Sequence, residues 1–217
     1  MQKSIYIRQI HWHMTIPKER PLSIKETEFI ESVRTVCKDN GIKFNLRPKK
    51  NVVVDGTRCV GYFSPDPLEL VCATNRADFI PVLVHESCHM DQFLEDRTPF
   101  DEEDIIDSWL HGKEFTQKQI NTCIKNSISL ELDCEKRSVT KIVEYGLDIN
   151  INQYIQGANA YILFYNFVKK NRVWYRKDTP PHEKFLVYET MPKRFMSDSY
   201  YYKLNPKIEK LFKKHIV

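Results

Sequence analysis

The 217-residue chain lacks any apolar run long enough to span a bilayer. Near the start, Arg8, Gln9 and His11 interrupt the chain before a signal-peptide apolar region can form. We therefore expect a cytoplasmic protein with no membrane partner. The six cysteines form no Cys-x-x-Cys pair. In a reducing compartment this spacing indicates small buried thiols rather than a disulfide framework.

Internal repeats, low-complexity tracts and Gly/Ser-rich linkers are also absent, and the length fits one domain with a sizeable core. The net charge of +4 is mild, so nucleic acid is not an expected partner. The densest basic stretch, residues 203–214, is interpreted as the solvated end of a final helix. The content of 41% hydrophobic and 29% charged residues is typical of a globular chain and excludes disorder.

The residue pattern predicts an α+β fold with a helical C-terminal half. Capping boxes start helices at Ser23 and Thr116, Gly41 and Gly146 end them, and Asp78 can cap a third helix. Helices are expected at about 23–41, 78–95, 116–145, 158–170 and 206–215, with a helical turn near 105–110. Strands are expected at 4–12, 42–46, 52–54, 58–63 and 69–74, with a hairpin at Asp55-Gly56. We expect one domain over residues 1–217, with a core at about 1–145 and a helical, aromatic extension at about 146–217.

The most informative segment reads His-Glu-Ser-Cys-His over residues 85–89, within an expected helix. This is the H-E-x-x-H pattern, in which two histidines four residues apart share one helix face and can bind one ion. Glu86 is placed to take a proton from a metal-bound water. The pattern predicts a zinc site with His85 and His89 as ligands and Glu86 as the general base.

A catalytic zinc needs a third protein ligand. Glu131 and Glu135 lie on the apolar stripe of the helix expected over 116–145, where an uncompensated carboxylate is costly. A metal cation would compensate that cost, although an ion pair or an outward-facing helix edge would also explain the two acids. We expect Glu131 as the third ligand and Glu135 as the hydrogen-bond acceptor of a ligand histidine. His111 is the alternative third ligand.

The remaining candidates have weaker signals. His11 and His13 alternate on the first expected strand and could form a second metal pair. The candidates for stabilising an oxyanion are Tyr161, Tyr165, His111 and His182. The two tyrosines also fit packing in a helical core. An extended peptide could pair with the strand edge near residues 60–63, where Gly61 permits close approach.

The segment from Leu68 to Arg137 resembles the gluzincin branch of zinc peptidases, including the small ImmA/IrrE-like and SprT-like metallopeptidase domains of bacteria and phages. The resemblance depends on residues 85–89 and on Glu131-Leu-Asp-Cys-Glu135. It implies a zincin-like core, in which a sheet precedes the H-E-x-x-H helix and a second helix supplies Glu131, with Glu135 behind it. It also implies Zn²⁺ as the cofactor and hydrolysis of a peptide or protein substrate. SprT-like members use a histidine as third ligand, which keeps His111 open.

Two other functions remain open. A structural zinc site would have four protein ligands, with His111 or Cys134 completing it, and the protein would then bind zinc or a peptide without cleavage. Glu86 argues against this function, because a structural site needs no base. A nucleic-acid-associated SprT-like protease is the other alternative, and the basic tail is its one support.

Overall fold

The computed structural model describes residues 21–54, 57–101, 105–174 and 180–215. The strand expected at 4–12 and the candidate pair His11 and His13 lie outside the described residues. The described chain is mixed α and β, with a small sheet and a helical C-terminal half, as the sequence predicts. It divides into two compact units, Met1–Glu103 with Arg137–Ile149, and Asp104–Lys136 with Asn150–Val217.

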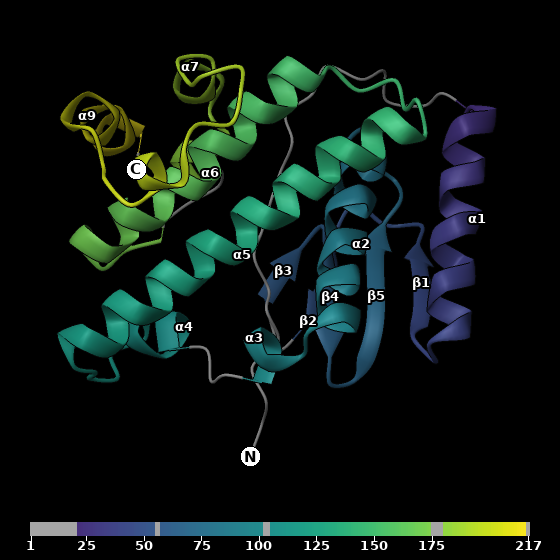
Figure 1. The fold of residues 1–217 in the computed structure, drawn as a ribbon, viewed down its shortest axis with the longest axis horizontal. Helices are drawn as coiled ribbons and strands as arrows, with labels where there is room; N and C mark the ends of the chain where they lie inside the picture. Colours follow the sequence, from purple (N-terminus) through teal and green to yellow (C-terminus); the bar gives the residue numbers. More distant parts are fainter. Residues whose placement is uncertain (1–20, 55–56, 102–104, 175–179, 216–217) are drawn as a thin grey trace. The chain divides into compact units, whose positions relative to one another are not determined.

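The first unit contains a three-stranded sheet with strand order β1-β5-β4 (Figure 1). Strand β1 (Lys43–Arg47) runs parallel to β5 (Leu68–Ala73), and β4 (Gly61–Pro65) runs antiparallel to β5. The predicted hairpin is present as the antiparallel pair β2 (Val52–Val54) and β3 (Thr57–Cys59).

The single strand expected over 58–63 is wrong, because the chain changes partner at Val60. The residues before Val60 pair with the hairpin strand β2, and those after it pair with β5. The Val60 carbonyl accepts a hydrogen bond from the Ala73 N–H at 2.9 Å, which brings the chain from the hairpin into the sheet.

Two helices pack on this sheet (Figure 1). Helix α1 (Ile24–Asp39) contacts β1, and α2 (Phe79–Glu95) contacts β4 and β5. The capping box of α1 is confirmed: the Glu26 N–H donates to Ser23 Oγ at 3.2 Å, and the Ser23 N–H donates to the Glu26 carboxylate at 2.8 Å. The short helix α3 (Thr98–Asp101) follows α2.

The start of α2 differs from the prediction. Asp78 lies at the N-cap position but makes no side-chain capping hydrogen bond, because its carboxylate is paired with the guanidinium of Arg76. The helix comes very close to β4 at Gly61. A Cβ placed on Gly61 would lie 2.7 Å from Cγ1 of Val82, so only glycine permits this approach.

The second unit is built around helix α6 (Ile151–Asn171), most of which is buried. Its helices also include α4 (Ile105–Leu110), the first part of α5 (Gln117–Glu144), η1 (Pro181–Glu183), α7 (Phe185–Tyr188), α8 (Asp198–Tyr201) and α9 (Pro206–His215). The capping box predicted for α5 is confirmed by reciprocal hydrogen bonds between Thr116 and Gln119. Among the described residues, no helix combines the length and apolarity required to cross a bilayer.

Helix α6 begins seven residues earlier than the segment expected at 158–170. The Asn150 side chain caps it by accepting a hydrogen bond from the Gln153 N–H at 3.1 Å. Polar amide side chains interrupt the apolar pattern of its first turns, so the sequence pattern does not indicate a helix there. In the structure these amides are buried and bind the backbone of the C-terminal segment. Gln156 Nε2 donates to the Met191 carbonyl at 3.0 Å, and Asn159 Nδ2 donates to the Pro192 carbonyl at 2.8 Å.

Candidate metal centre

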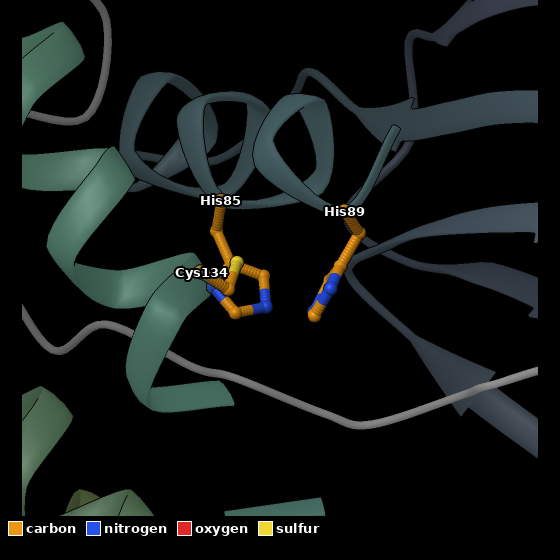
Figure 2. Close-up of side chains that lie close together, drawn as sticks. All are labelled: His85, His89 and Cys134. Atoms are coloured by element: carbon orange, nitrogen blue, oxygen red, sulfur yellow. The ribbon is translucent and has the colours of Figure 1, made fainter. Parts of the chain in front are cut away.

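His85 and His89 lie one turn apart on α2, and their imidazoles lie side by side. The ring centroids are 4.6 Å apart and the ring planes are nearly perpendicular, at 89°. Figure 2 shows both rings projecting from the same side of α2. His85 is buried and His89 is partly exposed. The structure therefore brings together the two histidines that the sequence selects as metal ligands.

Gln92 contacts the ring of His89. Its Oε1 lies 2.9 Å from Nδ1 of His89, and because a carbonyl oxygen can only accept, this contact is a hydrogen bond in the tautomer that carries its proton on Nδ1 and presents Nε2 to a metal. Hydrogen bonds of this kind orient histidine ligands in metal sites. The sequence analysis did not identify Gln92, although its position three residues after His89 places it on the same helix face.

Glu86 is buried, and the backbone of β4 holds its carboxylate. The Phe63 N–H donates to Glu86 Oε2 at 3.0 Å. A backbone donor to a carboxylate compensates part of the cost of burying its charge. Burial, and to a smaller extent the Glu86 carboxylate, raises the pKa of the nearby Cys59 thiol to about 12. In the absence of a metal ion, Cys59 is therefore a protonated thiol at neutral pH.

The last turns of α5 pack along α2 within the first unit. Ser138 Oγ donates to Cys88 Sγ at 3.4 Å, and Lys141 Nζ lies 2.7 Å from Asp91 Oδ2. Because residues three, four and seven apart share a helix face, the face of α5 that carries Ser138 also carries its preceding polar residues. These are Glu131, Cys134 and Glu135.

Cys134, one turn before Ser138, belongs to a group that can hold a metal ion. His85, His89 and Cys134 each offer one ligand atom, and these atoms lie within 4.8 Å of one another (Figure 2). Imidazole nitrogen and thiolate sulfur are both common zinc ligands. From the sequence, Cys134 is a candidate only for the fourth ligand of a structural site. Cys134 lies three residues after Glu131 and therefore on the same face of α5, and this spacing was the signal that could have marked it as a candidate third ligand.

Glu131 and Glu135 are completely buried, which confirms the burial inferred from the apolar stripe of α5. Within the second unit, the Tyr161 hydroxyl donates to Glu131 Oε1 at 3.2 Å. The hydroxyls of Tyr161 and Tyr165 lie 3.0 Å apart. Tyr161, selected from the sequence as a stabiliser of an oxyanion, is thus a hydrogen-bond partner of the expected third ligand. The ligand role of Glu131 and the oxyanion roles of the tyrosines stay predictions.

The two other candidate histidines lie in different environments. His111 follows the last turn of α4, its side chain is 78% exposed, and its Nδ1 lies 2.9 Å from the Asp107 carbonyl. His182 is buried in η1, with its ring 4.9 Å from that of Phe164 and 5.3 Å from that of Tyr161. The roles expected of His111, as a ligand or oxyanion stabiliser, and of His182, as an oxyanion stabiliser, stay predictions.

Comparisons of the chain with protein-family models, with curated proteins and with solved structures found no match. The resemblance to gluzincins therefore depends on residues 85–89 and 131–135 alone.

Proposed function

We propose that the protein is a zinc-dependent hydrolase that cleaves peptide bonds. The observation that supports this best is the arrangement on α2, where two imidazoles lie 4.6 Å apart and the neighbouring Glu86 carboxylate is buried and held by the Phe63 N–H. A structural zinc site would need the imidazoles but not a fixed carboxylate next to them. We also propose a zincin-like core for the first unit, since its small sheet precedes the H-E-x-x-H helix.

The proposed ligands are His85, His89 and one donor from α5. Cys134 is supported by its grouping with the two imidazoles, and Glu131 by its burial and by the resemblance to gluzincins. Imidazole, thiolate and carboxylate are all zinc ligands, so either donor set fits this ion. With three protein ligands, zinc keeps one open position, where it lowers the pKa of a water molecule and polarises a carbonyl group.

In this proposal Glu86 accepts the proton of the attacking water and passes it to the leaving amine. Its hydrogen bond from Phe63 fixes the direction of the carboxylate, which would otherwise have to be ordered during the reaction. Gln92 has the corresponding function for His89, because it fixes the tautomer that presents Nε2.

A peptide substrate is favoured by the position of β4. Among the described residues, β4 has a strand neighbour only at β5. The Val60 carbonyl points toward β5, where it accepts the hydrogen bond from Ala73. Because successive residues of a strand direct their backbone N–H and C=O groups to opposite edges, those of Gly61 and Phe63 point to the edge of β4 that faces away from β5. An extended peptide can add to such an edge as a further strand. The contact between Phe63 and Glu86 would then bring the peptide backbone next to the proposed base.

The test is cleavage of a peptide mixture by the zinc-loaded full chain, with new termini identified by mass spectrometry. Glu86→Gln should reduce the rate by about 10²–10⁴-fold while zinc stays bound, because the amide cannot take the proton. Glu95→Gln is the matched control, since Glu95 lies on the same helix but is exposed and pairs with Arg137. Cleavage by Glu86→Gln at the wild-type rate would refute the mechanism.

The second candidate function is zinc binding without catalysis, and the grouping of Cys134 with the two histidines supports it. If Cys134 and Glu131 both bound the ion, four protein ligands would close the site. X-ray absorption spectroscopy of the zinc-loaded protein separates the two functions. Three protein ligands and one water oxygen support the hydrolase, whereas four protein ligands support the structural site.

We also propose a cytoplasmic location for this activity. The six cysteines are buried thiols rather than disulfides, which suits a reducing compartment.

A further inference from the structure

A pocket in the first unit has the character of an anion-binding site. Its volume is about 670 Å³, a size that suits a small organic ligand. The hairpin, the sheet and the β1–β2 connection all contribute to its lining. The charged and polar side chains that matter here are Arg47, Lys49, Lys50, Arg58, Tyr62 and Glu69.

The pocket lies on the face of the sheet opposite α2. In β4, the residues that face α2 are Gly61, next to Val82, and Phe63, whose ring packs on Phe93. Tyr62, between them, points to the other face and packs in a cluster with hairpin residues such as Val54. The pocket is therefore separate from the candidate metal centre.

Four cationic side chains line the pocket, against the single carboxylate of Glu69. Within the part of the chain that the structure describes, none of Arg47, Lys49, Lys50 or Arg58 forms an ion pair. Converging positive charges without a counter-ion raise the local potential and attract anions.

The carboxylate at the base of the pocket is already engaged by neighbouring donors. The Tyr62 hydroxyl donates to Glu69 Oε1 at 2.7 Å, and Asn45 Nδ2 donates to Oε2 at 3.2 Å. Burial, together with this hydrogen bond to Glu69, raises the pKa of Tyr62, so the phenol remains a neutral donor. Glu69 therefore has partners other than the four cations, which remain available to a ligand.

The wall of the pocket is held in place by backbone hydrogen bonds. The Arg47 carbonyl accepts from the Thr74 N–H at 2.8 Å, and the Lys49 carbonyl accepts from the Asn75 N–H at 3.1 Å. The Lys50 carbonyl accepts a hydrogen bond from Nη1 of Arg76 at 3.0 Å. These bonds fix the segment from which three of the four cations project, which reduces the entropy cost of binding.

We propose that this pocket binds a small organic phosphate. A phosphate group has more than one negative charge and three acceptor oxygens, which matches arginine forks and lysine ammonium groups better than one carboxylate does. Val53, an exposed apolar side chain of the lining, provides a surface for the organic part. The cations line one pocket rather than a stripe, which favours a small ligand over a nucleic acid.

The test is isothermal titration calorimetry of the full chain with inorganic pyrophosphate and with adenosine diphosphate. We expect saturable binding of both, weakened about threefold to tenfold by Lys49→Gln or Arg58→Gln. Lys118→Gln, an exposed lysine on α5, is the matched control and should bind as the wild type does. Val53→Ser should weaken the binding of adenosine diphosphate but not of pyrophosphate. Thermal melts show that each variant is folded.

Three results would overturn the proposal. The first is no saturable binding of either probe up to about 1 mM, where the binding free energy is already only about −4 kcal/mol. The second is an equal loss in Lys118→Gln, which would indicate nonspecific attraction. The third is binding of single-stranded oligonucleotides that strengthens with their length and depends on the same residues, which would assign the surface to nucleic acid.

Discussion

The close approach of α2 to β4 makes Gly61 a sensitive position for the candidate site. In Gly61→Ala, the new Cβ would lie 2.7 Å from Val82 Cγ1, 2.9 Å from Cys72 Sγ and 3.1 Å from the Val71 carbonyl oxygen. Carbon atoms in contact are normally about 3.5–4.0 Å apart. The closest of these contacts, with Val82, is relieved when α2 moves away from β4, whereas the other two lie within the sheet, in β5.

The magnitude follows from the cost of overpacking, which is about 1–3 kcal/mol. For a chain of this size, each kcal/mol shifts the melting temperature by roughly 2–4 °C, so we expect Gly61→Ala to melt roughly 2–12 °C lower. The same movement lengthens the 3.0 Å hydrogen bond between Phe63 and Glu86. Stability and the geometry of the proposed base should therefore be lost together.

The assay is a double-mutant cycle that combines Gly61→Ala with Val82→Ala. Val82→Ala is chosen because it removes the Cγ1 atom that the new Cβ would contact. Val82→Ala alone leaves a cavity and should cost roughly 1–3 kcal/mol. The double variant should cost less than the sum of the two single variants, by about 0.5–3 kcal/mol. Urea denaturation followed by circular dichroism gives all three free energies.

Two results would refute this reasoning. One is a Gly61→Ala protein that unfolds with the wild-type free energy, which would mean that α2 does not rest on the glycine. The other is exact additivity in the cycle, which would mean that Val82 and Gly61 are not in contact.

Two further predictions concern single side chains. Gln92→Leu removes the acceptor that orients His89 and should weaken zinc binding by about 10–100-fold, measured by competition with a chromophoric chelator; an unchanged affinity would contradict the assigned tautomer. Burial raises the pKa of Tyr201 to about 12, above its ordinary value of 10.0, so the unfolded chain releases this proton first. Stability should therefore fall as the pH rises from about 10 towards about 12, and Tyr201→Phe should reduce that slope in urea titrations, whereas an unaltered slope would remove Tyr201 as its source.

The features that could be predicted from the sequence are those in which the evidence is local. A capping box needs two residues three apart, and Ser23 with Glu26 makes both of its hydrogen bonds. The H-E-x-x-H pattern also depends on spacing within one helix, and its two imidazoles lie together. The burial of Glu131 followed from the period of one helix, without any knowledge of its neighbours.

The features that could not be predicted depend on partners that are distant in the sequence. Asp78 was expected to cap α2, but its carboxylate pairs with Arg76 instead. The sequence pattern alone does not show whether the carboxylate will bind the helix backbone or the guanidinium. The partner change at Val60 depends on Ala73, in another strand. Cys134 resembles an ordinary buried thiol in the sequence, and only its grouping with the two histidines makes it a candidate ligand.

The early start of α6 was missed for a related reason. Gln156 and Asn159 interrupt its apolar pattern, and their buried amides make sense only when the C-terminal segment that they bind is in place. The pocket proposed to bind an organic phosphate was also missed, because its cations come from two separate segments of the chain.

In our proposal, His85 and His89 hold one metal ion together with a donor from α5. This metal binding is tested most directly by the zinc content of the purified protein, measured by inductively coupled plasma mass spectrometry. We predict about one zinc per wild-type chain and almost none in folded His85→Ala, since two remaining donors bind weakly. Cys134→Ser, Glu131→Gln and His111→Ala then identify the third donor by which of them also loses the ion. Stoichiometric zinc in His85→Ala, or none in the wild-type protein after zinc loading, would contradict the account.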